Sequence, residues 1–213
     1  MLDQIAAIAG AHHLAVMGGF HPGPDDGTPA GTRTLVLLGA QEPGHWAHLT
    51  AQPEWQDGKP DPVDRWSRRV IGGMACDLGA KALFPFGGPP WQPFQRWAMA
   101  TGRAWQSPVR LLVHDVAGLM VAYRGALALK DHVALPATGP KPCDSCAQPC
   151  LTACPAGALT GAGYDVPACH GWLDSKGQDC LSAGCLVRRA CPLSQSYGRV
   201  SEQSAYHMRQ FHK

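Results

Sequence analysis

Short apolar runs bounded by glycine and proline recur along the first 135 residues. The runs HLAVMGGF (13–20) and TRTLVLLGA (32–40) are rich in strand-forming residues and are separated by loop-like sequence, so they predict two β-strands. KALFPFGG (81–88) predicts a short strand that leads into a loop. Residues 109–129 predict two further strands joined near Gly118.

One longer stretch, residues 61–80, has a helical pattern instead. Its apolar residues recur at steps of three and four, which places them on one helix face. These residues are Val63, Trp66, Val70, Met74 and Leu78. Asp61 before Pro62 is typical of a helix start. A second helix is predicted over 92–102, where a glycine stands at the end.

These patterns predict an α+β fold made of two parts. Residues 1–135 form a mixed α/β domain, and PATGPKP (136–142) reads as a linker. Residues 143–195 are expected to form a small, helical, loop-rich module, followed by a C-terminal tail over 196–213.

Composition and charge limit the classes of function. Hydrophobic residues make up 45% of the chain and charged residues 16%, which suits a packed core. A net charge of +2 is too mild to indicate nucleic-acid binding. No apolar run reaches the roughly 18 residues of a membrane span, and no basic residue precedes Arg33 as a secretory signal would require. We therefore expect a cytoplasmic protein with reduced thiols and no membrane partner.

The last third of the chain carries eight of the nine cysteines. The first run is C-x2-C-x3-C-x3-C-P, and a second group ends in C-x4-C-x5-C-P. In two-cluster bacterial ferredoxins, three close cysteines bind one 4Fe–4S cluster, and the cysteine before proline binds the other cluster. This arrangement predicts two ligand sets. The first thiol set is Cys143, Cys146, Cys150 and Cys191; the second thiol set is Cys154, Cys169, Cys180 and Cys185.

The residues around these cysteines support cluster binding. Small residues after Cys154 allow backbone N–H groups to approach cluster sulfur atoms. Apolar residues are expected to shield the clusters from water, namely Leu151, Leu159, Leu181, Leu186, Val187 and Leu193. His170 is an alternative ligand to Cys169, and the basic Arg188 and Arg189 could offset cluster charge or remain solvated. Cys76 is expected to be a small buried residue rather than a ligand.

Zinc is the main alternative for the thiols. Paired C-x2-C motifs are common zinc ligands, but only Cys143 and Cys146 have that spacing. The Cys-Pro endings are not a feature of zinc sites. One cluster alone, or a redox disulfide system, is a further alternative.

The two Cys-Pro runs, with Cys169 between them in DVPACHGWL (165–173), resemble the dicluster module of epoxyqueuosine reductases and reductive-dehalogenase-like proteins. Residues 107–129 are similar to the segment that precedes the module in that group. The resemblance implies a nitroreductase-like N-terminal domain, which binds cobalamin in those proteins. The acidic catalytic motif of the reductases has no counterpart here, so the resemblance carries over the eight ligands and not the activity.

Three functions follow as hypotheses. The first is an iron–sulfur protein that transfers electrons to an unknown redox partner. The second is a small reductase, an oxidoreductase whose N-terminal domain binds a corrinoid or flavin and receives electrons from the clusters. The third is a binding module that zinc stabilises.

Overall fold

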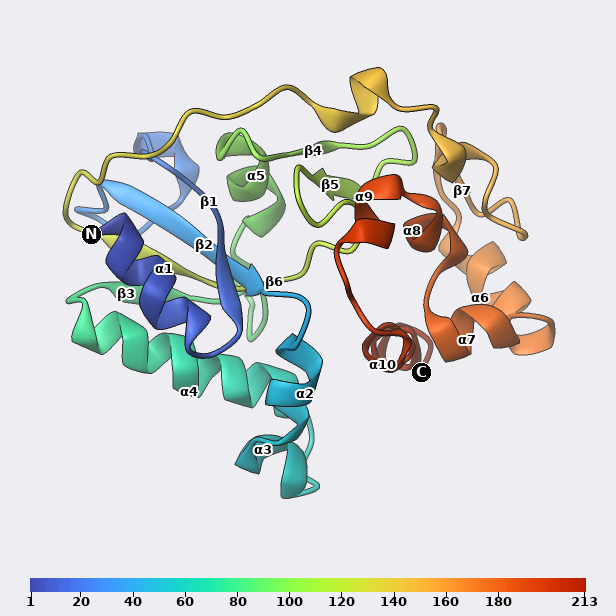
Figure 1. Ribbon diagram of the computed structural model, residues 1–213, viewed down its shortest axis with the longest axis horizontal. Coiled ribbons are helices and arrows are strands. Elements are labelled where there is room, and N and C mark those ends of the chain that lie inside the picture. The colour runs from blue at the N-terminus through green and yellow to red at the C-terminus, as the bar shows by residue number, and fades with distance from the viewer. The chain divides into compact units, whose positions relative to one another are not determined.

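The computed structural model describes all 213 residues, and they form an α+β fold with a small antiparallel sheet and several helices (Figure 1). The chain divides into two compact units. The N-terminal unit comprises Met1–Arg103 and Ala122–Gly139, and the cysteine unit comprises Ala104–Val121 and Pro140–Lys213. The division differs from the predicted domains because residues 104–121 belong with the cysteines.

A four-stranded antiparallel sheet, in the order β1-β2-β6-β3, forms the centre of the N-terminal unit. Its strands are β1 (Leu14–Phe20), β2 (Thr34–Ala40), β3 (Lys81–Leu83) and β6 (Tyr123–Leu129). Every residue of β2 is buried. A strand that is buried on both faces reads as a continuous apolar run, as TLVLLGA does.

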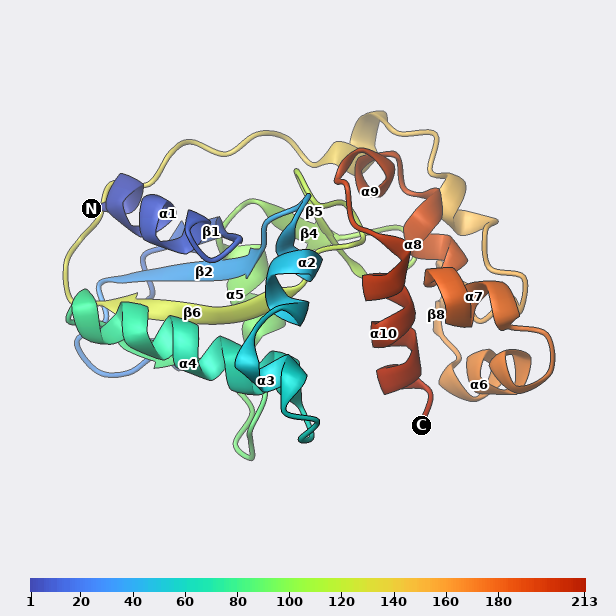
Figure 2. The ribbon, with the colours of Figure 1, turned by 60° about the horizontal axis from the view of Figure 1, so that its bottom comes forward.

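Helices cover this sheet, and Figure 2 shows α1 on one side of it and α4 on the other. The helices of the unit are α1 (Leu2–Gly10), α2 (His45–Thr50), α3 (Pro53–Gln56), α4 (Pro62–Asp77) and α5 (Phe94–Ala100), with a short 3-10 turn η1 (Pro24–Asp26). The two predicted helices are confirmed as α4 and α5. The sequence pattern did not identify α1, whose buried Ile5 and Ala9 lie one turn apart.

Helix α4 corrects two expectations. Its buried face includes Trp66 and Met74, but Cys76 is exposed. Two residues beyond Met74 correspond to about 200° of helical rotation, which turns Cys76 toward solvent. Asp61 does precede the helix, but its side chain makes no capping hydrogen bond.

The cysteine unit is built from short elements joined by loops. Its two small sheets pair β4 (Ala104–Gln106) with β5 (Leu112–His114) and β7 (Leu159–Thr160) with β8 (Gly163–Tyr164). Its helical elements are η2 (Pro142–Ser145), η3 (Pro149–Leu151), α6 (Val166–Ser175), α7 (Gln178–Ala183), α8 (Leu186–Ala190), α9 (Pro192–Ser196) and α10 (Ser201–Phe211). The two strands predicted within 109–129 therefore exist as β5 and β6, but they belong to different sheets.

The predicted C-terminal tail contains the helix α10, which packs against α7. Gln203, Ser204 and Ala205 are buried on it. A methyl group on Gly184 would lie 2.5 Å from the Cβ of Ser204, so glycine permits the close approach of α10 to the end of α7.

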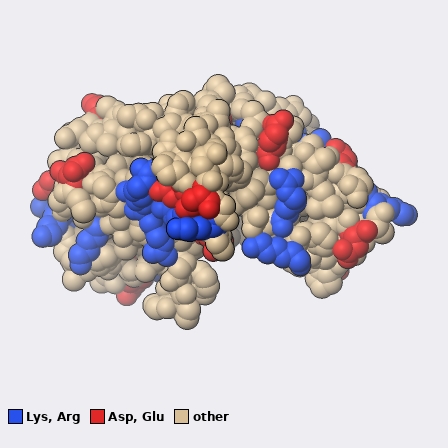
Figure 3. Space-filling view, turned by 90° about the horizontal axis from the view of Figure 1, so that it is seen from below, with Lys and Arg blue, Asp and Glu red and all other residues tan.

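Charged side chains of both signs are interspersed on the face shown in Figure 3. This distribution fits the mild net charge of the sequence. None of the helices combines the length and the hydrophobicity that a membrane-spanning helix requires.

An ion pair at the start of α4 leads to a prediction about pH. Arg65 donates a hydrogen bond to Asp57 at 2.7 Å and another to the carbonyl of Glu54. The bond to Asp57 is the main reason why the pKa of Asp57 is lowered to about 2. A carboxyl group whose pKa is lowered by folding stabilises the folded state at pH values above its unfolded-state pKa, near 3.9. This stabilisation is lost as the pH falls through the lower pKa of the folded state. We expect Asp57→Asn to lower the urea midpoint slightly at pH 7, because the pair is partly exposed.

The difference between Asp57→Asn and wild type should shrink as the pH falls from about 4 toward 2. Urea titrations of the full chain at several pH values measure it. Asp77→Asn, at the exposed end of α4, is the matched control. A difference that stays constant with pH would contradict the assigned role of the ion pair.

Candidate iron–sulfur site

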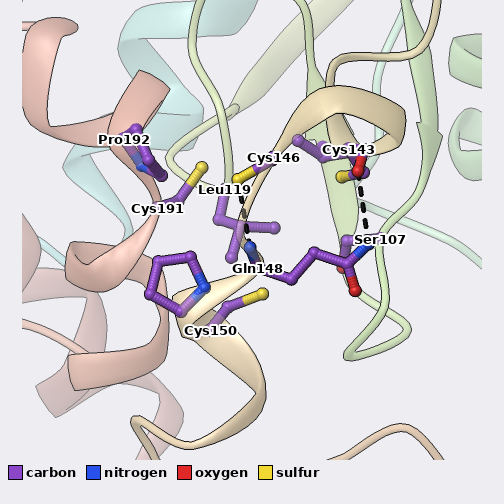
Figure 4. Close-up of a pocket in the computed structure, with 10 residues that line it drawn as sticks. Ser107, Leu119, Cys143, Cys146, Gln148, Cys150, Cys191 and Pro192 are labelled. Atoms are coloured by element: carbon purple, nitrogen blue, oxygen red, sulfur yellow. Dashed lines mark hydrogen bonds between the residues drawn. The ribbon is translucent and has the colours of Figure 1, made fainter.

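The first thiol set lines a single pocket in the cysteine unit. Cys143, Cys146 and Cys150 come from one loop, and Cys191 joins them from the junction of α8 and α9 (Figure 4). The sulfur atoms lie around a common space in this view, with Leu119 beside it. The structure therefore brings together the four residues that the sequence assigns to one cluster.

Local turns in the loop position these thiols. Cys143 and Cys150 lie in the 3-10 turns η2 and η3, each of which has a proline in its first turn. Gln148 between them has a left-handed backbone, with φ of 54°. Its N–H donates to the Sγ of Cys146 at 3.3 Å, and its side-chain amide donates to the carbonyl of Cys143 at 3.2 Å (Figure 4). Backbone N–H bonds to cysteine sulfur are one way in which a protein tunes an iron–sulfur cluster.

A helix begins directly after Cys191, at Pro192. Pro192 occupies the first position of α9, where its missing N–H leaves no helical hydrogen bond unmade. Cys191 just before it has an extended backbone, which ends α8 and starts α9.

The pocket is backed by an apolar core that residues 104–121 help to form. Val109, Val113 and Leu119 are buried there together with Leu159 and Val187. Leu193 packs against this core, whereas Leu151 is 41% exposed. The prediction that Leu151 shields a cluster is therefore wrong. It follows Cys150 directly in η3, and the turn that buries Cys150 directs the next side chain outward.

The environment of the first set disfavours isolated thiolates. Burial raises the pKa of Cys150, and the nearby Cys191 and Cys146 raise it further. The pKa of Cys143 is also raised, chiefly by burial, and Lys141 partly opposes this. Anionic sulfur atoms gathered in one buried place repel each other. A cysteine that binds a metal does so as a thiolate. The positive charge of bound iron would offset the repulsion between these thiolates.

The second thiol set is carried by four different segments. Cys154 follows η3, Cys169 lies in α6, Cys180 lies in α7, and Cys185 directly precedes α8. Burial raises the pKa of Cys169, and Cys185 and Cys154 add to this effect. Burial also raises the pKa of Cys180, and Cys185 is again a contributor. Among the cysteines, these effects link Cys169 with Cys154 and Cys185, and they link Cys180 with Cys185.

Cys169 has a hydrogen-bond partner that the sequence analysis did not identify. Burial raises the pKa of Tyr164, and its interaction with Cys169 raises that pKa further and lowers the pKa of Cys169. Phe211 of α10 stacks on Tyr164 with ring centroids 6.0 Å apart. His170, the alternative ligand, has its Nδ1 2.7 Å from the Nδ1 of His212.

The two arginines before Cys191 have different surroundings. Arg188 donates to the carbonyl of Leu119, which lines the first pocket, and its charge also interacts with Cys185 of the second set. Burial lowers the pKa of Arg188. Arg189 instead forms an ion pair of 2.5 Å with Asp179. Arg188 is thus a buried positive charge that interacts with Cys185 of the second set and donates to a backbone carbonyl beside the first pocket.

The structure contains no group of three or more His, Cys, Asp or Glu side chains arranged to hold a metal ion. A structural zinc site requires four donors at about 2.0 to 2.3 Å from one centre. In a 4Fe–4S cluster each thiolate binds a different iron, so the four sulfur atoms stand around a larger group. Four thiols with apolar surroundings fit the donor chemistry of such a cluster.

Sequence reasoning missed the residues that complete the first pocket. Ser107, Val113 and Leu119 line it from a segment assigned to the other domain, and no local pattern marks them. Gln148 could have been found, because it lies inside the cysteine loop. Comparisons of this chain with family models, with curated proteins and with solved structures found no match.

Proposed function

We propose that the protein carries two 4Fe–4S clusters and transfers electrons between redox partner proteins. The observation that carries this proposal is the first pocket, where Cys191 meets three cysteines more than forty positions earlier in the chain. A ferredoxin-type arrangement pairs the cysteine of a distant Cys-Pro run with three close cysteines of one loop. The first cluster would be held by the first thiol set and the second cluster by the second thiol set.

The chemistry of the proposal belongs to the clusters. When bound, the two clusters would supply one-electron transfer from a reduced donor protein to an oxidised acceptor protein. The polypeptide adjusts the potential by hydrogen bonds to sulfur, by nearby charge and by burial. Gln148 N–H, which donates to Cys146, Tyr164 beside Cys169 and the buried Arg188 would supply the first two effects.

Anaerobic purification followed by metal and sulfide analysis tests the proposal. We expect about eight iron atoms and about eight acid-labile sulfides per chain, with the broad visible absorption of 4Fe–4S clusters. Zinc without sulfide would overturn the proposal in favour of a zinc-stabilised module. A corrinoid or flavin spectrum in addition to the iron would instead support the reductase with a second cofactor.

A further inference from the structure

One buried polar group in the first pocket has no partner. The Oγ of Ser107 makes no hydrogen bond, although the residue is only 5% exposed. Buried hydroxyl groups are nearly always hydrogen-bonded, because an unpaired one loses its bonds to water without replacement. This group therefore calls for a ligand or another partner.

The fold does not account for this hydroxyl. The backbone N–H of Ser107 donates to Leu111 at 2.8 Å, and its carbonyl accepts from Arg110 at 2.9 Å. These bonds close the turn after β4 without the side chain. Serine hydroxyls in turns commonly bond to a neighbouring backbone group, but this one does not.

The location of Ser107 narrows the choice of partner for its hydroxyl to groups in the first pocket. It lines the same pocket as all four thiols of the first set. The other polar side chain there is Gln148, whose amide nitrogen already donates to Cys143. The remaining lining residues offer apolar surfaces or sulfur. Ser107 is thus the uncommitted hydroxyl donor of a pocket whose expected contents are sulfur acceptors.

We infer that the Ser107 hydroxyl donates a hydrogen bond to a sulfur atom of the first cluster and raises the reduction potential of that cluster. The inference rests on the proposed function. When the first cluster accepts one electron from the donor protein, negative charge is added on its iron and sulfur atoms. A hydrogen bond to sulfur stabilises this additional charge, so it favours the reduced form.

An anaerobic redox titration followed by electron paramagnetic resonance tests the inference in Ser107→Ala. At a fixed potential, the ratio of reduced to oxidised first cluster should fall by up to tenfold, which corresponds to a shift of about 59 mV for one electron. The second cluster should keep its potential. Ser107→Thr, which retains the hydroxyl, should keep the wild-type reduction potential of the first cluster. Ser67→Ala, which removes a buried hydroxyl from α4, should change neither cluster.

A purely structural role would give a different result. The cluster-free Ser107→Ala chain should unfold at the wild-type temperature or higher, since the unpaired hydroxyl contributes no bond there. A lower unfolding temperature of the cluster-free Ser107→Ala chain would overturn the inference. An unchanged reduction potential of the first cluster, or an equal shift in the potentials of both clusters, would also overturn it. If Ser107→Ala fails to assemble the first cluster, Ser107→Cys provides the measurement, with a weak donor and an intermediate shift.

Failure of the proposed function remains distinguishable from failure of the inference. A wild-type chain that contains no iron and sulfide refutes the clusters themselves. A chain with both clusters and no response to Ser107→Ala refutes only the role of the hydroxyl.

Discussion

Replacing Cys150 with alanine is expected to remove about half of the iron and sulfide, and replacing Cys154 is expected to remove the other half. The two residues are only four positions apart, yet they belong to different thiol sets. Cys150 is buried beside Cys191, whereas Cys154 interacts with Cys169. A cluster that loses one thiolate ligand is expected to be lost as a whole, so each variant should retain about four of about eight iron atoms.

The paramagnetic signals of the reduced protein show which cluster is lost. Cys150→Ala and Cys191→Ala should lose the same signal, and Cys154→Ala and Cys180→Ala should lose the other one. Cys76→Ala is the control, because Cys76 is exposed on α4 in the N-terminal unit and should leave the iron content unchanged. Loss of one common signal in Cys150→Ala and Cys154→Ala would refute the assignment of ligands.

The grouping of the first thiol set around one pocket could be predicted because the information for it is local and chemical. Ligand spacing and the proline after Cys154 and Cys191 constrain a loop around a cluster regardless of what surrounds it. The same is true of β2, which is an uninterrupted apolar run, and of α4, whose apolar residues follow the helical period.

The remaining features depend on contacts between distant residues. Residues 104–121 have a strand-like pattern of apolar residues, as β6 does. Such a pattern predicts that a segment is buried, but it does not say in which core. Val109 and Val113 enter the core beside the thiols, whereas β6 joins the four-stranded sheet. Gln203 is 2% exposed although glutamine is usually a surface residue, because α10 lies directly on α7.

Gly118→Ala is expected to destabilise the cysteine unit and to remove the first cluster while the second is retained. Gly118 has φ of 55°, and a methyl group on it would lie 2.6 Å from the backbone nitrogen of Ser194 and 3.0 Å from the Sγ of Cys191. The Ser194 hydroxyl also accepts from Leu119 N–H at 2.9 Å, so the loop and the first turn of α9 are held together. Relief of the clash must displace that turn and with it Cys191.

Overpacking of this kind costs about 1 to 3 kcal/mol in unfolding free energy, and the displaced thiol would no longer complete the first set. Gly79→Ala is the matched control, since Gly79 has φ of 62° and a methyl group there would meet no atom within 4 Å. In Gly79→Ala the alanine must adopt a left-handed backbone but meets no clash. The variant should therefore lower the free energy of unfolding by about 1 kcal/mol and keep all the iron. Urea unfolding and iron analysis of both variants measure the difference. Full iron content and both paramagnetic signals in Gly118→Ala would show that Cys191 does not depend on this contact for its position.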